Sequence, residues 1–387
     1  MRRHHSSNSP KPDILLTMSS PHSPVPSKQT MLLLSYLLLS RGSSGEGTPR
    51  AGLPALLLAN ISRQGFDELV LLAGSNHVLV RGMERLIAQL REAGDTERAS
   101  WAAHAMETEL GRIRNALPFL HRICEAIEEE KHDVTVIKSL DHWPDLGSDL
   151  DLYTNADSDK VIALMKRRFG AELAPRSWGD RLAHKWNFVI PGLPEAVEIH
   201  MGRLGQTGEQ LVLASAVASR SREVRIDGRT YRVPSISDRL MISTLQRMYR
   251  HFYFRLCDIV DSAELVERGA VDYEDLRLSA RKAGIWEGVA TYLNIVSDYV
   301  KQYRGIGLEL PRFVRAAARF GGEEVFYRRE FLRVPILPQS ASLYGSQLGG
   351  LLRRGELRSS ARLGLLPCLA TAAAVGQKIT GSDKGIW

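Results

Sequence analysis

The spacing of the apolar residues changes twice along this chain, and that change limits the folds open to it. From about residue 51 to residue 131, apolar side chains recur at three- and four-residue steps, as one buried helix face requires. Between Asp133 and Val233 short stretches typical of strands replace this pattern, and from Ser235 the helical spacing returns. The sequence therefore predicts an α+β protein, in which a small mixed sheet is flanked by N-terminal and C-terminal helical segments.

The N-terminal helical segment holds the most regular of these patterns, and Pro118 interrupts it. Proline lacks the backbone N–H that a helix interior uses, so we expect Pro118 to kink this helix or to divide it. The apolar stripe consists of Leu110, Ile113, Leu117, Leu120, Ile123 and Ile127.

Four short strands and one helix are expected in the middle of the chain. The helix covers 157–169, with Asp157 or Ser158 near its N-cap and Gly170 at its end. The order is strand, loop, strand, helix, strand, strand, which makes an α/β unit of about 100 residues. The expected strands are 134–137, 149–153, 185–190 and 196–200.

The C-terminal helical segment begins at Ser235, where Ser-Ile-Ser-Asp is a capping-box pattern. It predicts a long amphipathic helix, followed by helices at about 272–283 and 286–303. The buried face of the long helix is expected to contain Met241, Leu245, Met248, Phe252, Leu256 and Ile259.

Both ends of the chain have compositions typical of tails. Serine, proline, histidine and glycine dominate the first 50 residues, and glycine, serine and arginine dominate the region after Pro335. At 387 residues the chain is long enough for two or three packed units. The expected divisions are a disordered tail (1–50), a helical segment (51–132), the sheet unit (133–233), a helical domain (234–333) and a loosely ordered tail (334–387).

Charge, cysteines and hydropathy restrict the function only broadly. The formal net charge of +7 suits a phosphate-bearing substrate or RNA but selects neither. Cys124, Cys257 and Cys368 lie far apart, so they form neither a disulfide framework nor a zinc-ligand spacing, and we expect a protein of the reducing cytoplasm in which Cys257 is a core residue. The apolar runs 31–39 and 363–376 are shorter than the ~20 residues of a membrane helix, so no membrane span or membrane partner is expected.

Two acidic side chains on one strand are the feature that points to chemistry. Asp149 and Asp151 are expected on the same side of their strand, and Glu198 on a later strand repeats the alternation with His200. Neighbouring carboxylates repel unless a cation or a proton joins them, and oxygen ligands suit a hard divalent ion. If the two strands are adjacent, Glu198 completes a three-carboxylate site of the kind used for phosphoryl transfer. The simpler interpretation places Asp149 and Asp151 on the solvated face of an edge strand.

Other polar residues admit both a functional and a structural interpretation. His200 could orient Glu198 or contact a phosphate, or it could be a hydrogen-bonded structural residue, and Lys138 could neutralise phosphate or be solvated. Arg247, His251 and Arg255 are spaced four residues apart, so we expect them on one stripe of the long helix. That stripe faces either a cleft, where it would attract phosphates, or water. Asp258 is expected to pair with Arg255 on the helix surface.

These motifs resemble a known group of enzymes. Gly147-Ser148-Asp149-Leu-Asp151-Leu, followed by a strand bearing Glu198, is similar to the metal motif of the DNA polymerase β-like nucleotidyltransferase superfamily. Within it the chain resembles the uncharacterised bacterial nucleotidyltransferase family, which is itself similar to nucleotidyltransferases of toxin–antitoxin systems. The resemblance covers roughly residues 130–300 and includes Lys138-Ser139, Glu198-Ile-His200 and the segment from Arg247 to Asp258.

The resemblance implies a nucleotidyltransferase core at 133–233 that uses Mg²⁺ or Mn²⁺. Asp149, Asp151 and Glu198 would hold the metal, and a nucleoside triphosphate would be the donor substrate. The acceptor, whether protein, RNA or small molecule, stays open. The triphosphate would lie near Gly147, Ser148, Lys138, Ser139 and His200, where Ser139 replaces the family's usual glycine and its Cβ is expected to crowd the triphosphate. The alternatives are a non-catalytic nucleotide- or RNA-binding protein, toxin–antitoxin-like, and a scaffold whose helices bind a partner protein.

Overall fold

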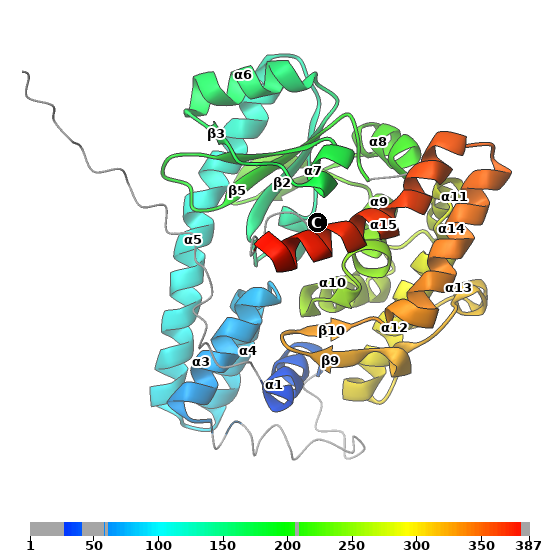
Figure 1. Cartoon of the computed structure of the whole chain (residues 1–387). Coiled ribbons are helices and arrows are strands. Elements are labelled where there is room, and N and C mark those ends of the chain that lie inside the picture. Colours follow the sequence, from blue (N-terminus) through cyan, green and yellow to red (C-terminus); the bar gives the residue numbers. More distant parts are fainter. Residues whose placement is uncertain (1–26, 41–57, 59–60, 206–208, 381–387) are drawn as a thin grey trace, which may run out of the picture.

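A five-stranded mixed sheet forms the middle of the protein in a computed structural model that describes residues 27–40, 58, 61–205 and 209–380 (Figure 1). Its strand order is β1-β2-β5-β4-β3, in which β2 and β5 are parallel and the other neighbours are antiparallel. Helices precede and follow the sheet in the sequence, so the predicted α+β class is confirmed. The strands are β1 (Val134–Val136), β2 (Asp149–Thr154), β3 (Glu172–Leu173), β4 (Lys185–Val189) and β5 (Ala196–Met201).

The four expected strands form within one residue of their predicted ends, and β3 was not predicted. Helix α6 (Ser158–Phe169) follows β2 and is also confirmed. The Asp157 side chain accepts hydrogen bonds from the N–H groups of Asp159 and Lys160, which caps the first turn. Gly170 ends the helix with a φ of 60°, a conformation that glycine adopts at little cost.

Helices α3 (Arg63–Ser75), α4 (Leu79–Glu92) and α5 (Thr96–Glu129) precede the sheet. Pro118 lies inside α5 but does not divide it. The reason is that apolar residues on both sides of the proline, such as Ile113 and Ile127, are buried in one core against the sheet.

The prediction of a tail over residues 1–50 is wrong for its described part. Helix α1 (Lys28–Leu39) begins at Ser27, whose hydroxyl accepts the Thr30 N–H. Its leucines, including Leu34 and Leu37, are buried against α3, α4 and α12 (Trp286–Arg304). The short apolar run therefore completes the helical core. The rest of the predicted tail lies outside the described residues.

The expected long helix after Ser235 is also wrong. Helix α9 (Ile236–Thr244) continues into one wider turn, η2 (Leu245–Arg250), and the chain leaves the helix at Phe252, which has a φ of 54°. A new helix, α10 (Leu256–Glu267), follows strand β8 (Tyr253–Phe254). Strand β8 pairs with β10 (Phe331–Arg333), which in turn pairs with β9 (Phe326–Arg328), so a partner distant in sequence stabilises the break.

The predicted helices near 272–283 and 286–303 are confirmed as α11 (Tyr273–Ala283) and α12. The loosely ordered tail after residue 334 is wrong for its described part, because α14 (Ala341–Arg353) buries Leu343 and Leu351 and α15 (Leu357–Thr380) packs on α14. The remaining elements are η1 (Ser139–His142), α7 (Trp178–Leu182), α8 (Glu209–Ser219), β6 (Arg222–Ile226), β7 (Arg229–Val233), α13 (Arg312–Ala317), η3 (Gly322–Glu324) and η4 (Ile336–Ser340).

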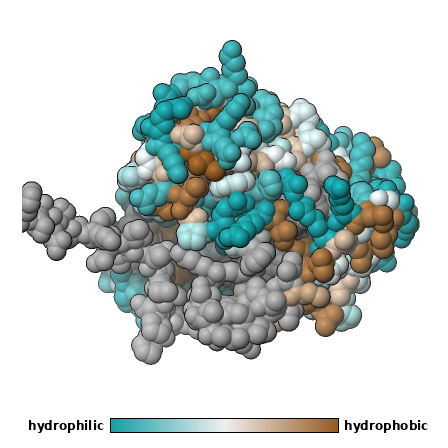
Figure 2. Space-filling view, turned by 45° about the horizontal axis from the view of Figure 1, so that its top comes forward, coloured by the Kyte–Doolittle hydropathy of each residue, from teal (hydrophilic) through white to brown (hydrophobic). Residues whose placement is uncertain are grey.

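Two hydrophobic cores organise the molecule. One joins α5 to the sheet and to the β6–β7 hairpin, and the other lies among α1, α3, α4, α9, α10 and α12. In Figure 1 the sheet lies above α10 and the β9–β10 hairpin, and α5 runs beside both halves. No helix among the described residues is long and apolar enough to cross a membrane. Figure 2 shows one face, where hydrophobic residues form separate patches between hydrophilic ones.

Candidate metal and phosphate site

Parallel pairing of β2 and β5 brings the acidic residues together. The register sets Asp151 beside Glu198 and Asp149 beside Ala196. One ligand atom each from Asp151, Glu198 and His200 lie within 4.8 Å of one another. Asp149 precedes Asp151 by two positions, so it shares that face of β2, and it lines the same pocket. The two strands on which the sequence places the acidic residues are therefore adjacent, and the closest group contains Asp151, Glu198 and His200 but not Asp149.

A pocket of about 260 Å³ surrounds these residues, between the sheet and the helices after it. All the residues expected to contact metal or triphosphate line it. Its walls come from β2, β4, β5, η1, α7, η2 and the start of α10. The lining residues used below are His77, Lys138, Ser139, His142, Gly147, Ser148, Asp149, Asp151, Asp180, Lys185, Glu198, His200, Arg247, Arg250, His251 and Arg255.

Two lysines pair with the carboxylates. Lys138 forms an ion pair with Asp151. Lys185, at the start of β4, lies 2.8 Å from a Glu198 oxygen and 3.0 Å from an Asp180 oxygen. Neither Lys185 nor Asp180 was predicted as a site residue from the sequence. The pattern Ser177-x-x-Asp180 was a detectable signal, because these residues form the capping box of α7 and hold the Asp180 carboxylate beside Lys185.

The turn after β1 positions both Lys138 and Ser139. Lys138 has φ 64° and ψ −55°, and the Ser139 N–H bonds the Ile137 carbonyl at 2.7 Å, which together define a rare, strained γ-turn. The Ser139 hydroxyl accepts the Asp151 N–H at 2.7 Å and donates to the Asp149 carbonyl at 3.1 Å. Instead of simply crowding the pocket, Ser139 ties the turn to the strand that carries both aspartates.

Burial and the neighbouring charges shift the pKa values of the three carboxylates in different directions. Burial raises the pKa of Asp151 to about 8, against the opposing effect of Lys138 and with the help of Glu198 and Asp149. Burial, with Glu198 nearby, also raises the pKa of Asp149. For Glu198, burial acts in the same direction, but Lys138 and Lys185 outweigh it and lower the pKa. At neutral pH the cluster therefore keeps a proton that a bound cation would displace.

His200 is suited to complete a cation site. It is 7% exposed, and neither ring nitrogen has a hydrogen-bond partner among the described residues, so the structural interpretation of a hydrogen-bonded histidine does not hold. Burial and the nearby Lys138 and Lys185 lower its pKa well below the usual value, which keeps the ring neutral and able to bind a metal. Two carboxylates and one imidazole fit Mn²⁺ and, with water ligands added, Mg²⁺.

Basic residues also line the pocket. Arg247, His251 and Arg255 all line it, which agrees with the cleft interpretation although they do not share one helix. Asp258 lies 2.7 Å from the Arg247 guanidinium, and its carboxylate accepts the Arg255 N–H at 2.7 Å. The expected surface pair of Asp258 with Arg255 is thus replaced by a buried pair with Arg247, because the chain bends at Phe252.

Comparison with known proteins adds no relative: no protein-family model, curated protein or solved structure matches this chain. The residues of the pocket are therefore the basis of the function proposed below.

Proposed function

We propose that this protein is a metal-dependent nucleotidyltransferase, which moves a nucleoside monophosphate from a nucleoside triphosphate to a hydroxyl or amine acceptor and releases pyrophosphate. The observation that carries the proposal is the parallel register of β2 and β5. It joins Asp151, Glu198 and His200 in a pocket that basic residues also line. Acidic groups for a cation and basic groups for phosphate in one pocket are what phosphoryl transfer requires.

The acidic wall would hold Mg²⁺ or Mn²⁺ through Asp149, Asp151 and Glu198. When bound, the ion neutralises the charge that develops on the phosphate oxygens. Because its pKa is lowered, Glu198 keeps its charge at neutral pH, so it would hold the ion beside the attacking hydroxyl or accept the proton of that hydroxyl. Attack forms a bond to the α-phosphorus and breaks its bond to the bridging oxygen of pyrophosphate.

The basic residues of the pocket would bind the triphosphate. Lys138, Arg250 and Arg255 line the pocket as cations, and Gly147 and Ser148 let the backbone approach closely. The pocket of about 260 Å³ is slightly below the ~300–1,000 Å³ of most small-molecule sites. It suits a polyphosphate with its ions, with the sugar and base toward the opening.

Transfer of label from each of the four α-³²P nucleoside triphosphates, with Mg²⁺ or Mn²⁺ and a cell extract as acceptor source, tests the proposal. We expect labelled product and pyrophosphate from the wild type, and at least about a hundredfold less from Asp149→Asn and Asp151→Asn, which remove charge at the position where the ion binds. Asp159→Asn, an exposed change on α6, is the matched control and keeps full activity. Equal pyrophosphate release by Asp151→Asn and the wild type would refute the proposal.

A second candidate, a non-catalytic nucleotide- or RNA-binding protein, is favoured by the ion pairs of Lys138 and Lys185, which neutralise the acidic cluster without a metal. Calorimetry separates the two. Triphosphate binding that is independent of divalent ions and is not followed by pyrophosphate release supports the binder, whereas turnover excludes it.

A further inference from the structure

A second cluster of potential metal ligands lies beside the pocket, and the proposed function does not use it. It contains His77 from the loop between α3 and α4, His142 at the end of η1, and Cys257 in the first turn of α10. One ligand atom from each lies within 4.8 Å of the other two. Both histidines line the pocket, whereas Cys257 is 0% exposed.

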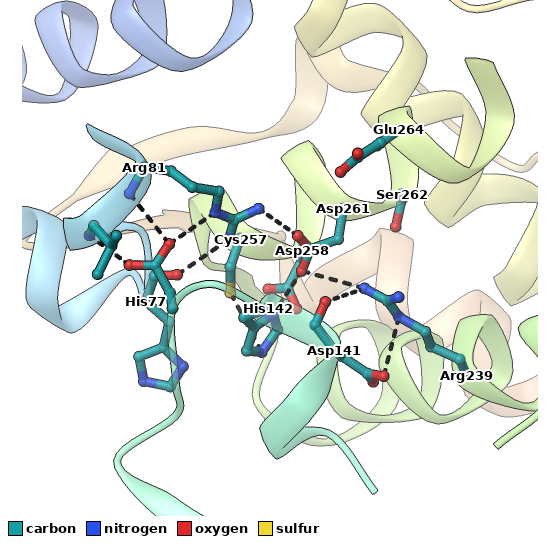
Figure 3. Close-up of polar contacts among 12 residues, drawn as sticks. His77, Arg81, Asp141, His142, Arg239, Cys257, Asp258, Asp261, Ser262 and Glu264 are labelled. Carbon is teal, nitrogen blue, oxygen red and sulfur yellow. Dashed lines mark hydrogen bonds and ion pairs between the residues drawn. The ribbon is translucent and has the colours of Figure 1, made fainter. Parts of the chain in front are cut away.

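The surroundings of His142 orient its ring (Figure 3). Its Nδ1 lies 2.5 Å from an Asp261 carboxylate oxygen, and its Nε2 lies 3.7 Å from the Cys257 sulfur. A histidine that donates Nδ1–H to a carboxylate presents Nε2 as a ligand, the usual arrangement behind a protein-bound zinc ion. Arg81 at 2.6 Å and Arg239 at 3.5 Å hold the same carboxylate in place.

The position of His77 is equally constrained. Its φ of 53° is uncommon for a residue with a Cβ. The preceding Asn76 fixes it to α10, because the Asn76 side-chain oxygen accepts the Leu256 N–H at 2.9 Å and its carbonyl accepts the Cys257 N–H at 3.3 Å. The His77 ring is 9% exposed, and its Nδ1 has no hydrogen-bond partner in the described part of the chain. A buried, unpartnered nitrogen is costly unless a ligand satisfies it.

We propose that His77, His142 and Cys257 form a zinc site separate from the acidic cluster. One thiolate and two imidazoles are a donor set that selects Zn²⁺ over Mg²⁺, and three protein ligands leave a fourth position open. Because the two histidines line the pocket, that fourth position lies on the pocket side. Zinc binding releases the Cys257 thiol proton to solvent.

Cys257, His142 and Asp261 also have the order of a nucleophile, its base and an orienting acid. The burial of Cys257 favours the metal, since a substrate cannot reach a sulfur with no exposed surface, and since a nucleophilic triad gives His77 no role.

Metal content and spectroscopy on the full chain test the zinc site without any assay of activity. The protein is stripped with a chelator, supplied with Zn²⁺ or Co²⁺, and dialysed. We expect about one equivalent of zinc per chain by mass spectrometry, and a thiolate-to-cobalt charge-transfer band with Co²⁺. Cys257→Ser loses the band and retains at least tenfold less zinc, whereas Cys124→Ser, a change at the other buried cysteine, keeps both.

Further outcomes decide whether zinc binds at this cluster or elsewhere in the pocket. The cobalt band of the wild type needs no variant, so its absence overturns the proposal even if Cys257→Ser fails to fold. If the two sites are separate, Glu198→Gln retains the zinc. If instead Glu198→Gln loses zinc and Cys257→Ser retains it, the ion lies at the acidic cluster and the proposal is overturned. Zinc retained by an inactive Asp151→Asn chain shows that this site stands apart from the nucleotidyltransferase proposal.

Discussion

Replacing Lys185 with methionine tests whether the acidic cluster binds a divalent cation or is neutralised by the lysines alone. The Lys185 side chain is 19% exposed and joins the Glu198 and Asp180 carboxylates, whose side chains are also mostly buried. Removal of one partner of a buried ion pair costs about 3–5 kcal/mol, and the partial exposure here reduces this to about 2–3 kcal/mol. We therefore expect metal-free Lys185→Met to melt on the order of 5 °C below the wild type.

A divalent ion should reverse much of this loss, because it supplies the charge that the lysine supplied. Mn²⁺ at about 100 times its Kd stabilises a folded protein by about 2.7 kcal/mol. In the wild type the ion must first displace the ammonium group of Lys185. The Mn²⁺-induced rise in Tm should therefore be larger in Lys185→Met, by roughly 2–4 °C for each kcal/mol that this displacement costs in the wild type.

The assay is thermal unfolding with Mn²⁺ and, separately, with a chelator. Lys160→Met, an exposed change on α6, is the control and should alter stability by less than about 0.5 kcal/mol under both conditions. If Mn²⁺ raises the Tm of wild type and Lys185→Met equally, or of neither, the acidic cluster does not take up a cation in competition with Lys185.

Three further outcomes are expected. Because burial and its acidic neighbours raise the pKa of Asp151 to about 8, the folded chain holds a proton that the unfolded chain has lost between about pH 4 and about pH 8. The stability of the metal-free protein therefore falls as the pH rises over that window. The affinity for Mn²⁺, measured by calorimetry, rises with pH by up to about tenfold per unit and levels off above about pH 8. An Mn²⁺ affinity that does not change with pH would contradict the shared proton. Ser139→Ala leaves the Asp151 N–H without its partner and should cost about 1–3 kcal/mol in urea unfolding, and no loss would mean that the turn is held otherwise. Leu34→Ala in the fully buried face of α1 should cost about 2–5 kcal/mol by the same measurement, and a change below about 0.5 kcal/mol would remove α1 from the core.

The sheet and its acidic residues could be predicted because the signals are local. Alternation over a few residues marks β2 and β5, and Asp157 and Gly170 mark both ends of α6. The adjacency of β2 and β5 was only assumed from the sequence, and their parallel pairing was not predicted, since no local pattern states which strands pair. The β6–β7 hairpin was missed even though Asp227-Gly228, both with positive φ, is a strong turn signal.

Features that depend on distant segments could not be predicted. The apolar spacing from Met241 to Ile259 continues through the break at Phe252, so periodicity alone favours one helix, and the strand that stabilises the break, β10, lies about 80 residues later. The apolar run that forms α1 is too short to indicate whether it is buried, and the serines and prolines around it led to the prediction of a tail. The cysteine spacing was interpreted as evidence against a zinc-ligand pattern, because the two histidines close to Cys257 lie far away in the sequence.

One short segment connects the two proposed ion sites. In η1, Ser139 holds the backbone of β2 at Asp149 and Asp151, and His142, three residues later, belongs to the zinc cluster. His77 touches the other end of this loop, since its ring lies about 3.7 Å from where a Cβ on Gly147 would be. Zinc at His77 and His142 would therefore fix both ends of the loop that precedes Asp149, which assigns the zinc a positioning role for the carboxylates rather than a place in phosphoryl transfer.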